Sequence, residues 1–276
     1  MPGTEDKCIF IILSYNSEGF LGGCMDSVLS LSAVDPYVYI ADNGSSDGSP
    51  GILRDYENRY EGKVFPTYLK ENRGTTVSRN ILITKALEDH PDAGYICVLD
   101  SDTVIDDGAV AYLKAAVDSD PKIFIASPRM VNGDGVEQMS VKRFPKFKAK
   151  FMKACPVGSV EEKGRRLEAY DFFPPKDGDT AVYEADYAIS ACWFMRKETI
   201  DICGLLDENI FYAPEDVDYC ATVWEKGGKV VLASGAKIKH LTQRISKKRL
   251  FSRMNLLHIK GLIYYRKKHR GSVNKS

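Results

Sequence analysis

Apolar and polar positions alternate in blocks along the first half of the chain. Five short runs are almost continuously apolar, at residues 8–15, 37–42, 64–69, 95–100 and 122–127. Four segments between them carry apolar residues at helical spacing, near 18–31, 49–60, 76–89 and 107–118. Buried strands that alternate with helices are typical of a parallel sheet with helices on both faces. We therefore predict an α/β fold with a mainly parallel central sheet.

The second half of the chain departs from this alternation and then returns to it. Residues 132–180 mix Lys, Arg, Pro and Gly with few long apolar runs, and predict loops with one or two short elements. Residues 183–204 then predict a strand followed by a helix. Acidic residues open a further helix that ends at Gly227, and residues 229–234 read as a strand.

Charge divides the chain into two parts. The 276 residues have a formal net charge of zero, yet residues 241–276 contain eleven Lys and Arg and no Asp or Glu. The preceding 240 residues therefore carry a net charge of −11. We predict a domain at 1–240 and a basic extension at 241–276. A basic segment on an acidic body indicates an anionic partner, such as a membrane surface, and nothing in the sequence indicates a nucleic acid.

The cysteines and the hydropathy of the chain indicate where in the cell the protein is located. The seven cysteines are scattered singly without a CxxC pair, and several lie in apolar runs, which is typical of reduced, buried thiols. No apolar run approaches the roughly 20 residues of a membrane span, and the first residues have no signal-peptide pattern. We expect a cytoplasmic protein that could bind peripherally to the inner face of a membrane.

Polar residues close three of the predicted strands. They are Ser14-Tyr15-Asn16, Asp42-Asn43-Gly44 and Asp100-Ser101-Asp102. In open parallel sheets, ligands bind at the carboxyl ends of the strands, so we expect these residues to share a site. Asp42 could accept a hydrogen bond from a base N–H or a ribose hydroxyl.

Asp100 and Asp102 form an Asp-x-Asp pair that suits a hard divalent cation, since Mg²⁺ and Mn²⁺ prefer carboxylate oxygens. Acids that favour the start of the following helix are an alternative. A phosphatase of the haloacid-dehalogenase type is a weaker one, because the glycine of its DxDGT motif is missing and Thr103 comes one position early. His240 is a single histidine, which is often structural, but beside an Asp metal site imidazole is a good ligand.

Arginines and acids supply the remaining candidates. Arg73 and Arg79 lie before and within the start of a predicted helix, where a diphosphate would be bound well, although Arg73 could equally belong to a solvated loop. Glu215 and Asp216 are adjacent acids that could provide a general base. Acids at a helix N-terminus also interact favourably with the helix dipole, which best explains Asp218.

In their order and spacing these stretches resemble the family-2-type glycosyltransferases of the GT-A fold, nearest the rhamnosyltransferase-like group. The matching segments are "IILSYN", "IADNGSSDGS", "ENRGTTVSRN", "YICVLDSDT", "SACWFMRKETIDICGLLDENIFYAPEDVDYC" and "KIKH". They cover most of residues 8–240. Each is weak alone, whereas the ordered set is specific. Relatives near the rhamnosyltransferases often carry a Gly/Ala-rich segment where this chain has "TTVSRN", so the sequence does not name the donor sugar.

The resemblance implies roles for individual residues. Asp102 and His240 would hold Mn²⁺ or Mg²⁺, Asp100 would face the ribose, and Asp216, with Glu215 beside it, would be the catalytic base. Nucleotide-sugar binding is implied for Ser14, Tyr15, Asn16, Asp42, Arg73, Arg79, Asp100, Ser101 and Trp193.

The implied activity is an inverting, metal-dependent transfer from a UDP- or dTDP-sugar to a hydroxyl of a glycan or lipid-linked acceptor. A sugar nucleotidyltransferase is an alternative, but the loop after the first strand, "SYNSEGFLGG", has no basic residue. A non-catalytic nucleotide-sugar or membrane-binding module of the same fold is another.

The basic extension repeats apolar residues at helical spacing, at Leu250, Phe251, Met254, Leu257 and Leu262-Ile263. It predicts a helix that either packs on the body or lies on an anionic lipid surface. We favour the lipid surface.

Overall fold

The computed structural model describes residues 6–145, 158–241 and 253–270. The first half runs β1 (Lys7–Ser14), α1 (Glu18–Leu29), β2 (Asp35–Asp42), α2 (Ser49–Arg59), β3 (Val64–Tyr68), α3 (Thr75–Asp89), β4 (Tyr95–Asp100), β5 (Thr103–Val104), α4 (Asp107–Ser119) and β6 (Ile123–Val131). These bounds confirm the predicted strands and helices to within a few residues.

The second half holds shorter elements before two long ones. They are β7 (Glu137–Gln138), β8 (Val141–Lys142), α6 (Gly158–Arg166), β9 (Val182–Glu184), β10 (Tyr187–Ala188), β11 (Cys192–Arg196), α7 (Glu198–Cys203), α8 (Glu215–Glu225), β12 (Lys229–His240) and α9 (Arg253–Lys268). β12 is longer than predicted, because pairing with β6 and β5 continues past the apolar run to His240.

The central sheet is mixed and mostly parallel, with strand order β3-β2-β1-β4-β11-β6-β12-β5. β2, β1 and β4 are parallel neighbours, whereas β11 is antiparallel to both β4 and β6. The strand order reverses between β1 and β4, which is the switch point where open α/β sheets bind ligands. The candidate residues that close β1, β2 and β4 therefore meet at one edge.

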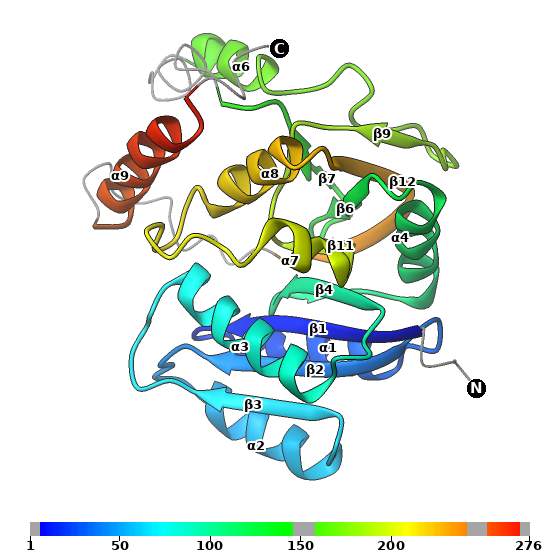
Figure 1. Cartoon of the computed structure of the whole chain (residues 1–276), viewed down its shortest axis with the longest axis vertical. Coiled ribbons are helices and arrows are strands. Elements are labelled where there is room, and N and C mark those ends of the chain that lie inside the picture. Colours follow the sequence, from blue (N-terminus) through cyan, green and yellow to red (C-terminus); the bar gives the residue numbers. More distant parts are fainter. Residues whose placement is uncertain (1–5, 146–157, 242–252, 271–276) are drawn as a thin grey trace.

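Helices cover both faces of this sheet (Figure 1). Alternate side chains of β1 point to opposite faces, so that Phe10 and Ile12 pack with α1, α2 and α4, and Ile9 and Ile11 pack with α3 and α8. The second cluster also contains Tyr265 of α9. The predicted α/β layers are thus confirmed.

The C-terminal helix α9 (red in Figure 1) lies beside α8. Tyr265 is buried, and Lys268 and His269 form ion pairs with Asp218 of α8. One face of α9 therefore packs on the body. Leu250 and Phe251 of the predicted apolar repeat lie outside the described residues.

Two further predictions concern the cysteines and membrane-spanning segments. Six of the seven cysteines lie in the described part of the chain, where all six are free thiols and five are buried. No helix in that part combines the length and the apolar character that crossing a membrane requires.

Candidate active site

Asp100, Asp102 and His240 converge at the carboxyl end of the sheet. β5 follows directly after Asp102 and pairs with the end of β12, where His240 lies opposite Thr103. His240 Nε2 consequently lies 3.5 Å from Asp102 Oδ1. One ligand atom from each of the three residues lies within 4.8 Å of the others. Two carboxylates and an imidazole are a donor set that suits Mn²⁺ or Mg²⁺, so these residues fit a divalent ion.

His240 is held from its other side by Gln138. Its Nδ1 lies 2.8 Å from Gln138 Oε1, and the Gln138 amide donates back to the His240 carbonyl at 3.0 Å. When Nδ1 carries the proton and donates to Gln138, Nε2 keeps its lone pair for a metal. Burial disfavours the imidazolium, but the hydrogen bond to Asp102 and its charge outweigh burial and raise the pKa of His240.

Arg79 joins the two ends of the site. Its side chain is only 1% exposed, and its Nη2 lies 2.8 Å from Asp100 Oδ1 and 3.1 Å from the Ser190 carbonyl. Its Nη1 lies 3.7 Å from Glu215 Oε1. The guanidinium therefore bridges the Asp-x-Asp segment and the N-terminus of α8. In this structure Asp100 thus faces Arg79.

Glu215 and Asp216 occupy the first turn of α8 in different environments. Burial, followed by the charge of Asp216, raises the pKa of Glu215 to about 8, against the opposing charge of Arg79. Glu215 Oε1 accepts a hydrogen bond from Ser190 Oγ at 2.9 Å. Asp216 is half-buried, and its Oδ1 accepts from the Val217 amide. The raised pKa favours the protonated form of Glu215, which leaves Asp216 as the better base of the two.

Asp42 closes β2 with one oxygen available to a ligand. The residue is 4% exposed, its Oδ2 accepts from the Ser45 amide at 3.2 Å, and its Oδ1 has no hydrogen-bond partner among the described residues. The hydroxyl of Ser14, at the end of β1, is also buried without such a partner. Buried polar atoms are normally paired, so these two atoms fit a nucleoside that would complete their hydrogen bonds.

Tyr15 and Asn16 form the turn after β1. Asn16 has a φ of 52°, in the left-handed region, and its side-chain oxygen accepts from the Ser46 amide at 2.9 Å. The Asn16 amide donates to Ser45 Oγ, so the turns after β1 and β2 brace each other. Tyr15 is 40% exposed beside them.

Three other predicted residues have different surroundings. Ser101 is buried, with its hydroxyl 2.8 Å from that of Ser17. Arg73 is exposed, and its backbone amide donates to Asn43 Oδ1. Trp193 is fully buried in the core, where its ring stacks on that of Tyr219. The structure therefore does not bring the Trp193 side chain to the surface of the site.

Gln138 and Ser190 were missed as positioning residues, and Asn43 was expected at this edge of the sheet without a role. Asn43 Oδ1 accepts from the Arg73 amide and from Ser78 Oγ, which fixes the turn before α3. Its place directly after Asp42 was an available signal. Gln138 and Ser190 lie far from their partners in sequence, and only the fold brings them together.

A mixed, mostly parallel sheet with helices on both faces and acids at the ends of its parallel strands is the architecture of GT-A glycosyltransferases. Residues 9–201 match the family model described as "Glycosyl transferase family 2". The chain belongs to this glycosyltransferase family.

Curated relatives match parts of the chain. It is 30% identical over 129 residues to the poly-beta-1,6-N-acetyl-D-glucosamine synthase of Staphylococcus epidermidis, covering 46% of this chain and 30% of the relative. It is 37% identical over 89 residues to the putative teichuronic acid biosynthesis glycosyltransferase TuaG of Bacillus subtilis, covering 32% of this chain and 33% of the relative. The matches thus span about a third of each relative.

Solved structures confirm the fold. GalNAc-T7 with UDP, GalNAc and Mn²⁺ matches with a TM-score of 0.68 and 16% identity, over 95% of this chain and 47% of that one. Staphylococcus aureus TarS 1–349 in complex with UDP matches with a TM-score of 0.52 and 16% identity, over 84% of this chain and 60% of that one.

Proposed function

We propose that this glycosyltransferase is inverting and metal-dependent, and that it moves a sugar from a UDP- or dTDP-sugar to a hydroxyl of a glycan or lipid-linked acceptor. The observation that carries the proposal is the convergence of Asp100, Asp102 and His240 beside Arg79 and α8. Relatives that make polysaccharides, and neighbours bound to UDP or Mn²⁺, support the same class of substrates.

Different residues of the site would bind the metal, bind the nucleoside and activate the acceptor hydroxyl. Asp102 and His240, with Asp100 beside them, would hold the divalent ion, which when bound stabilises the charge that develops on a nucleotide diphosphate. Asp42 and Ser14 would bind the nucleoside through their unpaired oxygens. Asp216 would accept the proton of the acceptor hydroxyl, and a single displacement would invert the anomeric centre.

The donor and the metal can be tested together. UDP and dTDP binding would be measured by calorimetry with and without MnCl₂, and nucleotide release from a panel of UDP- and dTDP-sugars would follow turnover. Asp102→Ala should remove the gain that Mn²⁺ gives to nucleotide binding. Asp134→Ala, at an exposed acid, is the matched control. Metal-independent binding by wild type, or pyrophosphate release from UTP or dTTP with a sugar 1-phosphate, would contradict the proposal.

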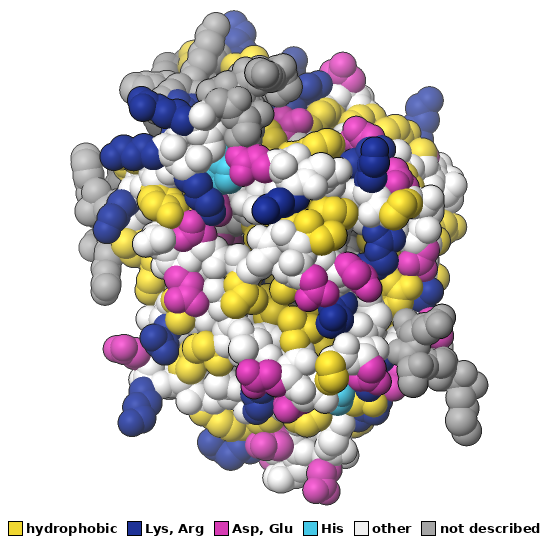
Figure 2. Space-filling view, in the orientation of Figure 1, with side chains coloured by type: hydrophobic (Ala, Val, Ile, Leu, Met, Phe, Trp, Pro, Cys, Tyr) yellow, Lys and Arg dark blue, Asp and Glu magenta, His cyan; other side chains and the backbone are white. Residues whose placement is uncertain are grey.

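We also propose that residues 1–240 form the catalytic domain, and that the extension at 241–276 holds it on anionic membranes at the cytoplasmic face. The outward face of α9 supports this, because Ile259 and Ile263 are 54% and 53% exposed and lie one turn apart. Exposed Lys260, Lys267 and Arg270 flank them, and basic side chains gather over α9 at the upper left of Figure 2. Such a face fits an interfacial helix.

Co-sedimentation would test the membrane surface. The protein should bind phosphatidylglycerol vesicles more tightly than phosphatidylcholine vesicles, and Ile263→Asp should weaken that binding because it places a charge on the outward face. Equal binding of both vesicles would exclude the anionic surface.

A further inference from the structure

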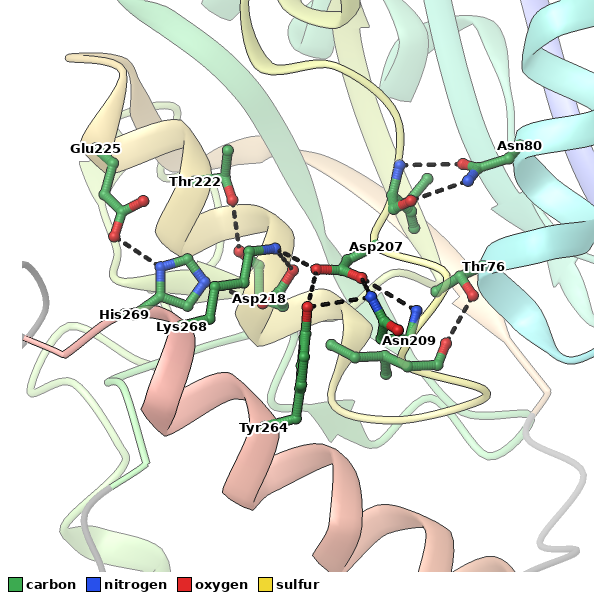
Figure 3. Close-up of polar contacts among 12 residues, drawn as sticks. Thr76, Asn80, Asp207, Asn209, Asp218, Thr222, Glu225, Tyr264, Lys268 and His269 are labelled. Carbon is green, nitrogen blue, oxygen red and sulfur yellow. Dashed lines mark hydrogen bonds and ion pairs between the residues drawn. The ribbon is translucent and has the colours of Figure 1, made fainter.

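The inner face of α9 carries a dense set of polar contacts with the segment that leads into α8 (Figure 3). Lys268 Nζ lies 2.7 Å from Asp218 Oδ2 and 2.9 Å from Asp207 Oδ2. Tyr264 donates to the same Asp207 oxygen at 2.9 Å. One lysine thus joins the loop after α7 to the first turns of α8.

Asp218 is a buried acid that α9 keeps in place. Its side chain is 3% exposed, and besides Lys268 it contacts His269 Nε2 at 2.9 Å. His269 Nδ1 contacts Glu225 Oε1 at 2.7 Å, so the imidazole lies between two carboxylates. An isolated buried carboxylate is costly, whereas one that pairs with a lysine and contacts an imidazole nitrogen has its charge compensated. Asp218 therefore fixes α8 against α9.

α9 also contacts the turn that precedes α8. A Cβ placed on Gly261 of α9 would lie 2.5 Å from the Ala213 carbonyl oxygen and 2.9 Å from Pro214 Cδ. These two residues directly precede Glu215. α9 therefore lies in van der Waals contact with the turn from which the catalytic helix begins.

The other side of the same loop is anchored to α3. Asn80 makes paired hydrogen bonds with the Leu206 backbone, at 3.0 Å to its amide and 2.9 Å to its carbonyl. Thr76 Oγ1 donates to the Ile210 carbonyl, and the Thr75 amide donates to the Phe211 carbonyl at 2.7 Å. Residues 204–214 are thus held between α3, which carries Arg79, and α9.

We propose that α9 is a clamp that positions the first turn of α8 for catalysis, with Lys268 as the positioning residue. This inference rests on the proposed role of Asp216 as the base. Asp216 lies two residues before Asp218, so a shift of the α8 N-terminus would displace the base from the acceptor hydroxyl. A misplacement of about 1 Å costs on the order of a hundredfold in rate.

Lys268→Met is the test variant, because this side chain is 32% exposed and its loss leaves the core filled. Lys122→Met, at an exposed lysine that directly precedes β6, is the control of equal charge. Hydrogen exchange should rise in residues 205–216 of Lys268→Met and stay unchanged in β4. With the donor that the panel identifies, kcat should fall tenfold or more while the KM for the donor changes less than about twofold. Lys268→Arg should restore kcat.

Faster hydrogen exchange in residues 205–216 of Lys268→Met with an unchanged kcat would overturn the proposal. Hydrogen exchange equal to that of wild type would overturn it as well. If Lys268→Met does not fold, the same exchange and kcat measurements on Gly261→Ala test the proposal. This substitution pushes α9 from the Ala213-Pro214 turn without removing a charge. Asp216→Asn is measured in parallel. Full turnover by Asp216→Asn would refute the proposed base, whereas the exchange result would still report on the clamp.

Discussion

Replacement of Arg79 by methionine tests whether the bridge between Asp100 and Glu215 holds the site together. The guanidinium is 1% exposed and pairs with both acids. Breaking a buried ion pair by removing one partner costs about 3–5 kcal/mol, because a charge is left uncompensated. Asp100 is 37% exposed at its side chain and stays hydrated, and Glu215 can remain protonated. We therefore expect a smaller loss of about 2–3 kcal/mol in the free energy of unfolding.

Urea unfolding followed by circular dichroism would measure this loss, and a thermal scan should show a midpoint lower by about 5–10 °C. Arg73→Met removes the same charge at an exposed position and should change stability by less than about 0.5 kcal/mol. Adding Asp100→Asn to Arg79→Met should recover part of the loss, because it removes the charged acid that loses its partner. A loss in Arg79→Met as small as that in Arg73→Met, or strict additivity in the double variant, would refute the reasoning.

Three further predictions concern the metal, a backbone contact and pH. His240→Ala should weaken Mn²⁺ binding about tenfold or more in calorimetry, while the outward Lys239→Ala should leave it unchanged. Gly74→Ala should destabilise by more than about 2 kcal/mol in urea unfolding, because φ is +82° and the new Cβ would lie 2.1 Å from the Phe211 carbonyl oxygen. Asp218 and Glu225 raise the pKa of His269 against its burial. The stability that His269 contributes is therefore complete below its unfolded pKa of about 6.5 and is lost as the pH rises through its folded value. His269→Gln should flatten the decline in stability above about pH 6.5, and an unchanged slope would contradict this pairing.

Local pattern was sufficient to predict the alternating strands and helices, because β1, β2 and β4 are apolar on both faces and each ends at a polar residue. Rules of parallel sheets then placed Asp42 and Asp100 at one edge. The contact of His240 with Asp102 depended on the length of β12. Its alternating lysines hid that length, since only pairing with β6 and β5 carries the strand to His240.

Other parts of the site depend on contacts that no local pattern encodes. Gln138 reaches His240 across 102 residues, and Ser190 meets Glu215 across 25 residues of one matching stretch whose pattern does not indicate the contact. Trp193 lies in a matching stretch, yet its large apolar ring gains more from the core than from a polar site. Lys268 and His269 belong to a basic segment whose pattern left packing on the body and contact with lipid both open, while their pairing with Asp218 required the packed helices.

The antiparallel direction of β11 has a consequence for how such enzymes diversify. β6 ends at the same edge where β11 begins, so the connection between Val131 and Cys192 starts and returns at the edge that holds Asp100, and its described part adds β7 and β9 to the sheet. The hydrogen bonds that join β3, β2, β1 and β4 do not depend on this excursion. Its length and sequence can change during evolution while the frame that holds the nucleotide side persists. The excursion is therefore a natural unit for exchange between relatives, and chimaeras joined at Val131 and Cys192 that keep Gln138 and Ser190 would preserve the pairing of β3, β2, β1 and β4.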